Sequence, residues 1–539
     1  MSLPSSDWSL RTQLQTVGCR TEEDAGSVPL QSIAGHDPSA KLALALALVL
    51  RATHGGRMAT CTTQFASRLP LPPGPSLLSG PMPVNDIART FQIWSRKFGP
   101  VVHFRLAGQN FIVLGTRRAA QDLLEKRASI YSSRPPSKFL DNYLHKGLAS
   151  AFMPYGPQWK LHRRLSSNLL SAKASNAYQY LQDIKSKQML YGFLSSHDFS
   201  EAFLRYTSDI MFTLIYGKGR GSDDGDHKRL HQINEMAVFV LQKASYGMLL
   251  LDLFPFLDWL PRFLLTWREK ASELHEKTKK VYTECSNIAL QGDSWNWSHE
   301  ALQRSEAKEL PWDDVCYSLG ELYVAGIHTT KMVLEIMIMI CILKPEVMKK
   351  AQEELDSVVG ADRIPSFSDI ESLSYIRALV SELLRWRPIS PIGVPHAAIQ
   401  DDEYMGYAIP AGSTVIANQL GMNEDETIFD KPQDFNPDRY LENPELPVSG
   451  FGFGRRLCPG HHLARNSLHV VTARLLWAYD ISPVDGKLGD QLNPASFKAN
   501  FHVRAPEKKQ IIESESAVAD KDEKAIMEKI QDKFRGVGV

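Results

Sequence analysis

The longest helical pattern in the chain covers residues 312–343, and it constrains the fold more than any other feature. Apolar side chains recur through it with a helical period, which predicts one long helix. Asp313 and Asp314 lie in the expected first turn, where carboxylates suit the positive end of the helix dipole. Pro345 follows closely and ends the helix. Most of the chain from Arg117 to Leu384 has a similar helical character, which predicts a mainly α fold.

Short strand patterns accompany these helices. Residues 101–106 and 111–114 are rich in β-branched and aromatic side chains around a turn at 107–110, which predicts a β-hairpin. Residues 389–450 contain many Pro, Gly and Asp residues with short strands between them, and a last helix is expected over 459–478. The expected fold class is therefore mainly α with smaller β sheets.

The two ends of the chain differ from its middle. Residues 1–69 resemble a leader, 70–505 a folded domain, and 506–539 a charged tail that we expect to be exposed. The apolar run at 42–50 is shorter than the ~20 residues that span a bilayer. It begins too deep in the chain for an ordinary signal peptide, so a weak membrane anchor and a plain leader both remain open.

Charge and cysteine content exclude several classes of protein. The chain has 61 basic and 61 acidic residues and a net charge of +0, so no basic excess indicates a nucleic-acid partner. Its 6 cysteines are far apart and form no CxxC pair. A disulfide scaffold or a structural zinc site is therefore not expected.

The strongest chemical signal is the segment Phe451–Gly460, which reads FGFGRRLCPG. Its glycines allow tight turns and a close approach of the backbone to a flat ligand. Cys458 precedes an expected helix start, and that helix end, together with nearby Arg455 and Arg456, favours a thiolate. From the residues alone, a nucleophile, a metal ligand and a structural thiol all remain open.

This segment resembles the cysteine-ligand loop of the cytochrome P-450 family, F-x-x-G-x-R-x-C-x-G. Phe451, Gly454, Arg456, Cys458 and Gly460 fall in register with it. The resemblance implies a triangular, mainly helical haem-thiolate fold with a long central helix. It also implies haem b as cofactor, held next to Phe451, with Cys458 as the axial iron ligand and Arg456 paired with a haem propionate.

A second motif, Glu382-Leu383-Leu384-Arg385, is weak alone, because an i, i+3 pair of this kind is usually a surface ion pair. The same family buries such a pair, and residues 435–440 resemble the segment that supplies a second arginine, here Arg439. By this resemblance Glu382, Arg385 and Arg439 form a structural network behind the haem.

A third motif, residues 325–330 (AGIHTT), lies in the long helix. Alone it reads as a patch of small residues at a helix crossing. In the family this patch lies above the iron, and Thr329 matches the oxygen-handling threonine. His328 departs from the family, which usually has Asp or Glu there. Proton relay, a structural role and weak distal ligation of the iron remain open for His328.

Two further anchors fit the resemblance. Residues 155–164 resemble the family's W-x-x-x-R helix, in which Trp159 and Arg163 lie one turn apart and reach a single propionate. Residues 394–396 resemble the strand whose last residue, here His396, touches the other propionate.

The substrate side is predicted to be apolar. Residues 248–261 resemble a channel lid that also dips into a membrane, and the pocket would be lined by 132–148, 317–324, 390–394 and 496–501. These segments predict that the substrate is a small molecule, apolar and fairly bulky. No flavin or dinucleotide fingerprint is present, so electrons are expected from NADPH through a separate flavoprotein, an NADPH-cytochrome reductase.

The resemblance predicts a fungal-type microsomal monooxygenase of secondary metabolism that inserts one oxygen atom from O2 by hydroxylation or epoxidation. Its expected place is the cytosolic face of the endoplasmic reticulum membrane. Two alternatives remain: an enzyme that uses or rearranges a peroxide without reductase, which His328 would favour, and a haem-binding sensor without catalysis.

Overall fold

The computed structural model describes residues 69–75, 86–217, 225, 228, 229, 232, 235, 251–259, 266–484, 497–519 and 522–536. The predicted leader, except its last residue, and its apolar run at 42–50 lie outside this range. The statements below concern the described part of the chain.

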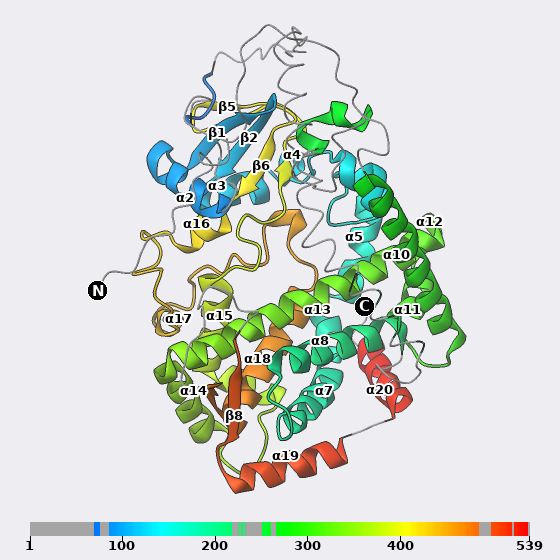
Figure 1. Ribbon diagram of the computed structural model, residues 1–539, viewed down its shortest axis with the longest axis vertical. Coiled ribbons are helices and arrows are strands. Elements are labelled where there is room, and N and C mark those ends of the chain that lie inside the picture. The colour runs from blue at the N-terminus through cyan, green and yellow to red at the C-terminus, as the bar shows by residue number, and fades with distance from the viewer. Residues whose placement is uncertain are drawn as a thin grey trace, which may run out of the picture. The chain divides into compact units, whose positions relative to one another are not determined.

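The predicted central helix is present as α13 (Trp312–Leu343), with Asp313 and Asp314 in its first turn (Figure 1). It ends at Lys344 because Pro345 takes the first position of α14 (Pro345–Val358). Helices α8 (Phe199–Tyr216), α10 (Thr266–Gln291) and α18 (His461–Ala478) pack against α13. The main core forms between these helices, which confirms the mainly α fold class.

The remaining helices surround this core or cover the sheet. They are α2 (Ile87–Phe98), α3 (Arg117–Ala120), α4 (Ala128–Tyr131), α5 (Pro157–Leu169), α6 (Ala172–Ala177), α7 (Gln179–Gly192), α11 (Trp297–Gln303), α12 (Ser305–Glu309), α15 (Ser374–Trp386), α16 (Gln419–Asn423) and α17 (Asp438–Glu442), with the short helical turns η1 (Gln121–Lys126), η2 (Leu140–Leu144), η3 (Pro255–Trp259), η5 (Phe367–Ser372) and η6 (Gly454–Arg456).

A four-stranded sheet lies beside α2, α3 and α16 (Figure 1). The predicted hairpin is confirmed as β1 (Val101–Leu106) and β2 (Gln109–Leu114), paired antiparallel. Strand β6 (Thr414–Ala417) pairs parallel to β2, and β3 (His396–Ala397) pairs antiparallel to β6. A bridge between Ser133 and Ala397 ties the segment after α4 to β3, which brings two distant parts of the site together.

Two small sheets complete the strands. Strand β4 (Asp402–Tyr404) pairs with β5 (Tyr407–Ile409), and β7 (Tyr479–Pro483) pairs with β8 (Ala499–Val503), both antiparallel.

The expectation of an exposed C-terminal tail is wrong. Residues after 505 form α19 (Pro506–Val518) and α20 (Glu523–Gly536). Helix α20 buries Ile526, Met527, Ile530 and Phe534, and the Phe534 ring lies 5.1 Å from that of Trp295. These four residues form one apolar stripe at helical spacing. The prediction missed this stripe because most of the other residues in the segment are charged.

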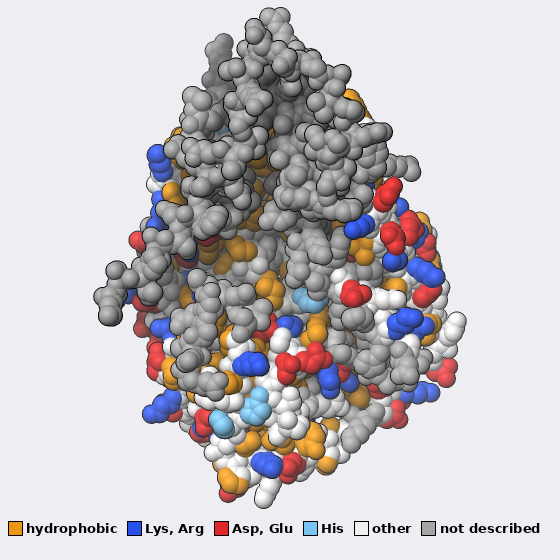
Figure 2. All heavy atoms as spheres, in the orientation of Figure 1, with side chains coloured by type: hydrophobic (Ala, Val, Ile, Leu, Met, Phe, Trp, Pro, Cys, Tyr) orange, Lys and Arg blue, Asp and Glu red, His pale blue; other side chains and the backbone are white. Residues whose placement is uncertain are grey.

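The surface agrees with the neutral charge balance. On the face shown in Figure 2, acidic and basic side chains are interspersed over the coloured part of the surface. Among the described helices, α13 alone has the length and composition of a membrane span, and 67% of its most apolar window is buried inside the fold. It therefore serves here as a core helix.

Candidate active site

The cysteine loop is held in shape by its own backbone. The Cys458 N–H donates to the Phe451 carbonyl at 2.9 Å, and η6 forms the turn between them. Gly454 has φ +54°, and a Cβ there would lie 2.1 Å from the Leu124 carbonyl oxygen of η1. Only glycine fits at this position. The Cys458 carbonyl in turn bonds to His461 Nδ1 at 2.8 Å, which fixes the loop to the start of α18.

The Phe451 side chain leans toward α18 rather than along the loop. Its ring centroid lies 6.0 Å from that of His461 and 5.4 Å from the Arg465 guanidinium carbon. Phe451 thus contributes to the site by its carbonyl and by packing the loop against the helix.

Burial raises the pKa of the Cys458 thiol, and the Gly460 N–H and the Arg163 charge oppose this effect only in part. The cation that faces the sulfur therefore comes from α5. Arg455, expected from the sequence to assist, instead donates to the Tyr155 hydroxyl. A thiol with a raised pKa is a poor free nucleophile at neutral pH, whereas a bound metal ion deprotonates a thiol outright. The chemistry of the buried sulfur thus favours a metal ligand.

Four basic side chains, Arg134, Arg163, His396 and Arg456, interact electrostatically with one another, and Arg163 among them acts on the Cys458 sulfur; we call them the cationic cluster. Arg456 stacks on the Trp159 ring at 4.2 Å. Burial, together with the charges of Arg134 and Arg163, lowers the pKa of Arg456 to about 9. The pKa of His396 is lowered to about 3 by burial, then by Arg134 and Arg456. The structure thus brings together Trp159, Arg163, His396 and Arg456, all of which the sequence singled out.

None of the cluster's four members forms an ion pair with a described carboxylate. Arg456 donates instead to the carbonyls of Ser132, Ser150 and Met153, at 2.7, 3.1 and 2.5 Å. Three arginines lie together here, Arg134 buried and Arg163 and Arg456 half-buried, and the charges of the first two lower the pKa of the third; such a group matches a ligand with more than one negative charge. The two propionates of haem have this chemistry, so the residues present fit that group.

Arg134 is the member that sequence reasoning missed. It donates to the carbonyls of Ala151, Val394 and Pro395 at 2.9, 2.8 and 2.9 Å. Burial lowers its pKa to about 10. The only signal in the sequence is an arginine between Ser133 and Pro135, in a segment predicted merely to line the pocket.

The small residues of the third motif, residues 325–330, lie on two different sides of α13. Gly326 contacts α8, where a Cβ would lie 2.7 Å from the Met211 sulfur. Ala325 and Thr329 are instead exposed, although Tyr323, Ile327 and Thr330 around them are buried.

The small residues therefore serve both a helix crossing and an open face. On that open face the Thr329 hydroxyl donates to the Ala325 carbonyl at 2.8 Å, within the helix.

His328 is half-buried beside Thr329. Burial lowers its pKa, and the Lys331 charge adds to this effect. Its Nε2 is enclosed and has no hydrogen-bond partner among the described residues. The side chain is therefore neutral at pH 7, and its Nε2 is not engaged by another described residue.

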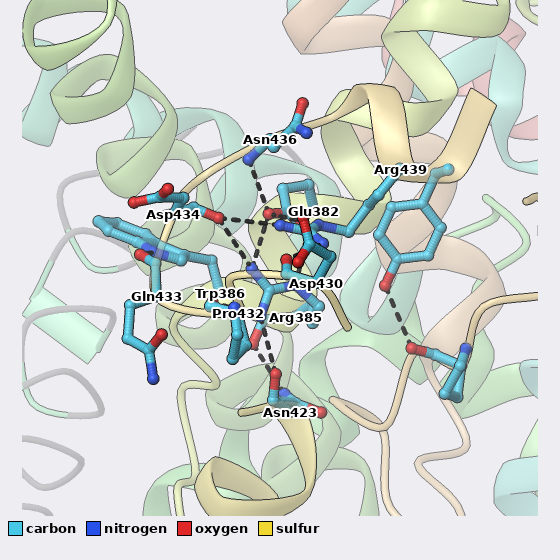
Figure 3. Close-up of polar contacts among 12 residues, drawn as sticks. Glu382, Arg385, Trp386, Asn423, Asp430, Pro432, Gln433, Asp434, Asn436 and Arg439 are labelled. Atoms are coloured by element: carbon cyan, nitrogen blue, oxygen red, sulfur yellow. Dashed lines mark hydrogen bonds and ion pairs between the residues drawn. The ribbon is translucent and has the colours of Figure 1, made fainter. Parts of the chain in front are cut away.

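The predicted Glu-Arg residues form a fully buried network (Figure 3). Arg385 makes two bonds to the Glu382 carboxylate, at 2.6 and 2.7 Å, and Arg439 Nε lies 3.3 Å from it. Arg385 also donates to the carbonyls of Asn423 and Pro432, at 2.8 Å each. The network thus ties α15 and α17 to the loops that precede the cysteine loop.

Comparisons with known proteins agree with this geometry. Residues 70–506 match the family model "Cytochrome P450". A cytochrome P450 monooxygenase, FrzL, of Cladobotryum sp. is 39% identical over 86% of this chain and 93% of its own length. The monooxygenase aneD of Aspergillus aculeatus is 38% identical over 85% and 93%. A solved zebra fish cytochrome P450 with abiraterone is similar to 78% of this chain and 100% of its own, with 25% identity and a TM-score of 0.62.

Proposed function

This chain belongs to the cytochrome P450 family and is a monooxygenase, and on that premise we propose that it hydroxylates or epoxidises an apolar, bulky organic molecule in fungal-type secondary metabolism. The family implies haem iron with a thiolate ligand, an external source of electrons, and O2. When bound, the haem supplies the activation of O2 that side chains cannot provide. The observation that carries the proposal is the cationic cluster, one member of which, Arg163, acts on the half-buried Cys458 sulfur.

The chain's own residues have distinct parts in this proposal. Cys458 would ligate the haem iron through its thiolate, and Arg134, Arg163, Arg456 and His396 would hold the propionates by charge and hydrogen bonding. This contact also offsets the mutual repulsion that lowers the pKa of Arg456 and His396.

On the open face of α13, Thr329 holds or passes a proton at Oγ1. His328, neutral at pH 7, relays a proton through its free Nε2 in place of the family's acid. The role of Glu382, Arg385 and Arg439 is structural.

Electrons are proposed to come from NADPH through a separate flavoprotein reductase, and the enzyme to act at the cytosolic face of the endoplasmic reticulum membrane. The predicted channel lid supports contact with a membrane surface. Of that segment, residues 251–259 are described, and the Trp259 side chain is 86% exposed at the end of η3. An exposed tryptophan suits the interface between lipid and water.

The test is the absorption spectrum of the reduced protein with carbon monoxide, for wild type and Cys458→Ala. We expect a strongly red-shifted Soret band in wild type that the variant loses. An unshifted band in folded wild-type protein would contradict thiolate ligation. The protein is then reconstituted with a reductase, and NADPH consumption is measured with and without candidate substrates.

One observation favours a second candidate: the neutral His328 in place of an acid is compatible with an enzyme that uses or rearranges a peroxide. Such an enzyme converts its substrate with peroxide and without NADPH. Product formation that strictly requires NADPH and reductase excludes it.

A further inference from the structure

Glu321 places a carboxyl group on the open face of α13. Residues 321, 325 and 329 are four apart and so share one side of the helix. Ala325 and Thr329 on this side are exposed, and Glu321 is half-buried. Its carboxyl therefore faces the same side of the helix as the Thr329 hydroxyl.

A short chain of contacts connects Glu321 to the cationic cluster. Its Oε2 accepts the Ser150 N–H at 2.8 Å, and the Ser150 carbonyl accepts a bond from Arg456 at 3.1 Å. Arg134 holds the next residue, Ala151, through its carbonyl. The carboxyl thus lies against the same loop that the cluster holds.

Glu321 has no counter-charge among the described residues. Its ionisable neighbours are Tyr317 on α13 and Tyr282 on α10, and burial raises the pKa of both hydroxyls well above the usual value. Beyond Tyr317 lie His145, whose Nδ1 is 2.9 Å from the Tyr317 hydroxyl, and His275, and burial lowers the pKa of both imidazoles. All four side chains are therefore neutral at pH 7.

The carboxyl group is not needed for the contact with Ser150. A glutamine would accept the same N–H without the cost of burying an ionisable group. Burial raises the pKa of Glu321 to about 8, and the Ser150 hydrogen bonds offset this only in part. An unneutralised buried carboxyl next to a reaction site is typical of a functional group.

We propose that Glu321 binds a protonated nitrogen of the substrate, so that the enzyme acts on bulky apolar molecules that carry a basic amine. This inference rests on the proposed function, since it names the substrate class of the same site. The helix rises ~12 Å over the eight residues from Glu321 to Thr329, so the oxidised carbon lies roughly that far or less from the nitrogen.

The test uses pairs of probes that differ only in charge. Each pair is an N,N-dimethylalkylamine with a terminal phenyl, naphthyl or indolyl group, and the hydrocarbon in which CH replaces the nitrogen. Binding to the haem-loaded enzyme is titrated through the change in its Soret band at pH 8.5. Wild type is expected to prefer the amine at least tenfold in one or more pairs.

Two variants make the result specific. Glu321→Gln keeps the acceptor for Ser150 and is expected to abolish the preference. Asp314→Asn removes a carboxyl from the first turn of the same helix and is expected to keep it, because Asp314 lies near Lys279 and Gln158 instead. A preference that survives in Glu321→Gln, or that no pair shows in wild type, would overturn the inference.

Proton release gives an independent readout. Burial raises the pKa of Glu321 to about 8, so the carboxyl is mostly protonated at pH 7 and must lose its proton when it pairs with a cation. Calorimetry in buffers of different ionisation enthalpy should show proton release on amine binding in wild type and none in Glu321→Gln. If the reduced protein with carbon monoxide lacks the red-shifted Soret band, the proposed function is refuted. If that band is normal but no amine is preferred, only this inference is refuted.

Discussion

Replacing Arg385 with lysine keeps the charge but removes the geometry that the buried network requires. The five N–H groups of the guanidinium make five hydrogen bonds: two to Glu382 and one each to the carbonyls of Asn423, Pro432 and Asp434. A lysine ammonium has three donors on a single nitrogen. At least two of the five bonds are therefore lost in Arg385→Lys, inside a region that water does not reach.

Each buried acceptor left without a partner costs about 1–3 kcal/mol, so the variant should lose about 2–6 kcal/mol of unfolding free energy. This is a large fraction of the ~5–15 kcal/mol that stabilises a typical protein. We expect a clear fall in the urea midpoint, followed by tryptophan fluorescence and by the Soret band.

Arg377→Lys is the matched control, since it changes the same residue type on the same helix, α15. Arg377 pairs with Glu371 at 3.3 Å, and the two side chains are 49% and 87% exposed. Such a surface pair contributes about 0–1 kcal/mol, so the control should unfold like wild type. Equal midpoints for the two variants would refute the argument that the number of donors, rather than the charge, stabilises the network.

Three further outcomes follow from the structure. Thr329→Val removes the hydroxyl on the open face of α13, so product formed per NADPH consumed should fall about tenfold or more, with the balance appearing as peroxide, while the red-shifted band persists; unchanged coupling would count against a proton role. The pKa values of His145, His162 and His469 are lowered to about 4 by burial, so between about pH 6.5 and 4 the unfolded chain binds protons that the folded chain does not. As the pH is lowered through this window, the free energy of unfolding should decrease by up to about 4 kcal/mol per pH unit, and His162→Gln should reduce that slope by about a third; an identical slope would show that His162 does not contribute. Deleting residues 523–536 removes four buried apolar side chains of α20, worth on the order of 6 kcal/mol in transfer free energy, so the yield of folded protein should collapse; a truncated protein with a normal thermal midpoint would contradict the burial of α20.

Sequence reasoning succeeded where one local signal decides the outcome. The bounds of α13 follow from the carboxylates after Pro311 and from Pro345, and the β1–β2 hairpin follows from alternating strand residues around a tight turn. The mainly α fold class could be predicted for the same reason, because its helices are long and strongly periodic.

It failed where distant segments decide the outcome. Arg134 binds carbonyls that lie 17, 260 and 261 residues further along the chain, and no local pattern contains that information. Arg163 of α5 faces the Cys458 sulfur, although Arg455 and Arg456 are closer in sequence. In α20 the apolar stripe lies within a strongly charged segment, and its burial depends on Tyr178 and Trp295, which the segment does not contain.

Two arginine groups of the described chain differ in how their charge is balanced, and the contrast between them separates structure from function. Arg385 and Arg439 share the Glu382 carboxylate, so their charge is balanced within the protein. Arg134 and Arg456 pair with no described carboxylate; both donate to carbonyl oxygens, and Arg456 also stacks on the Trp159 ring. Removing a buried charge from its partner is costly, so a fold that buries unbalanced arginines gains stability from whatever anion binds there. The first group is thus complete in the protein alone, whereas the second is completed by an anionic ligand beside Cys458.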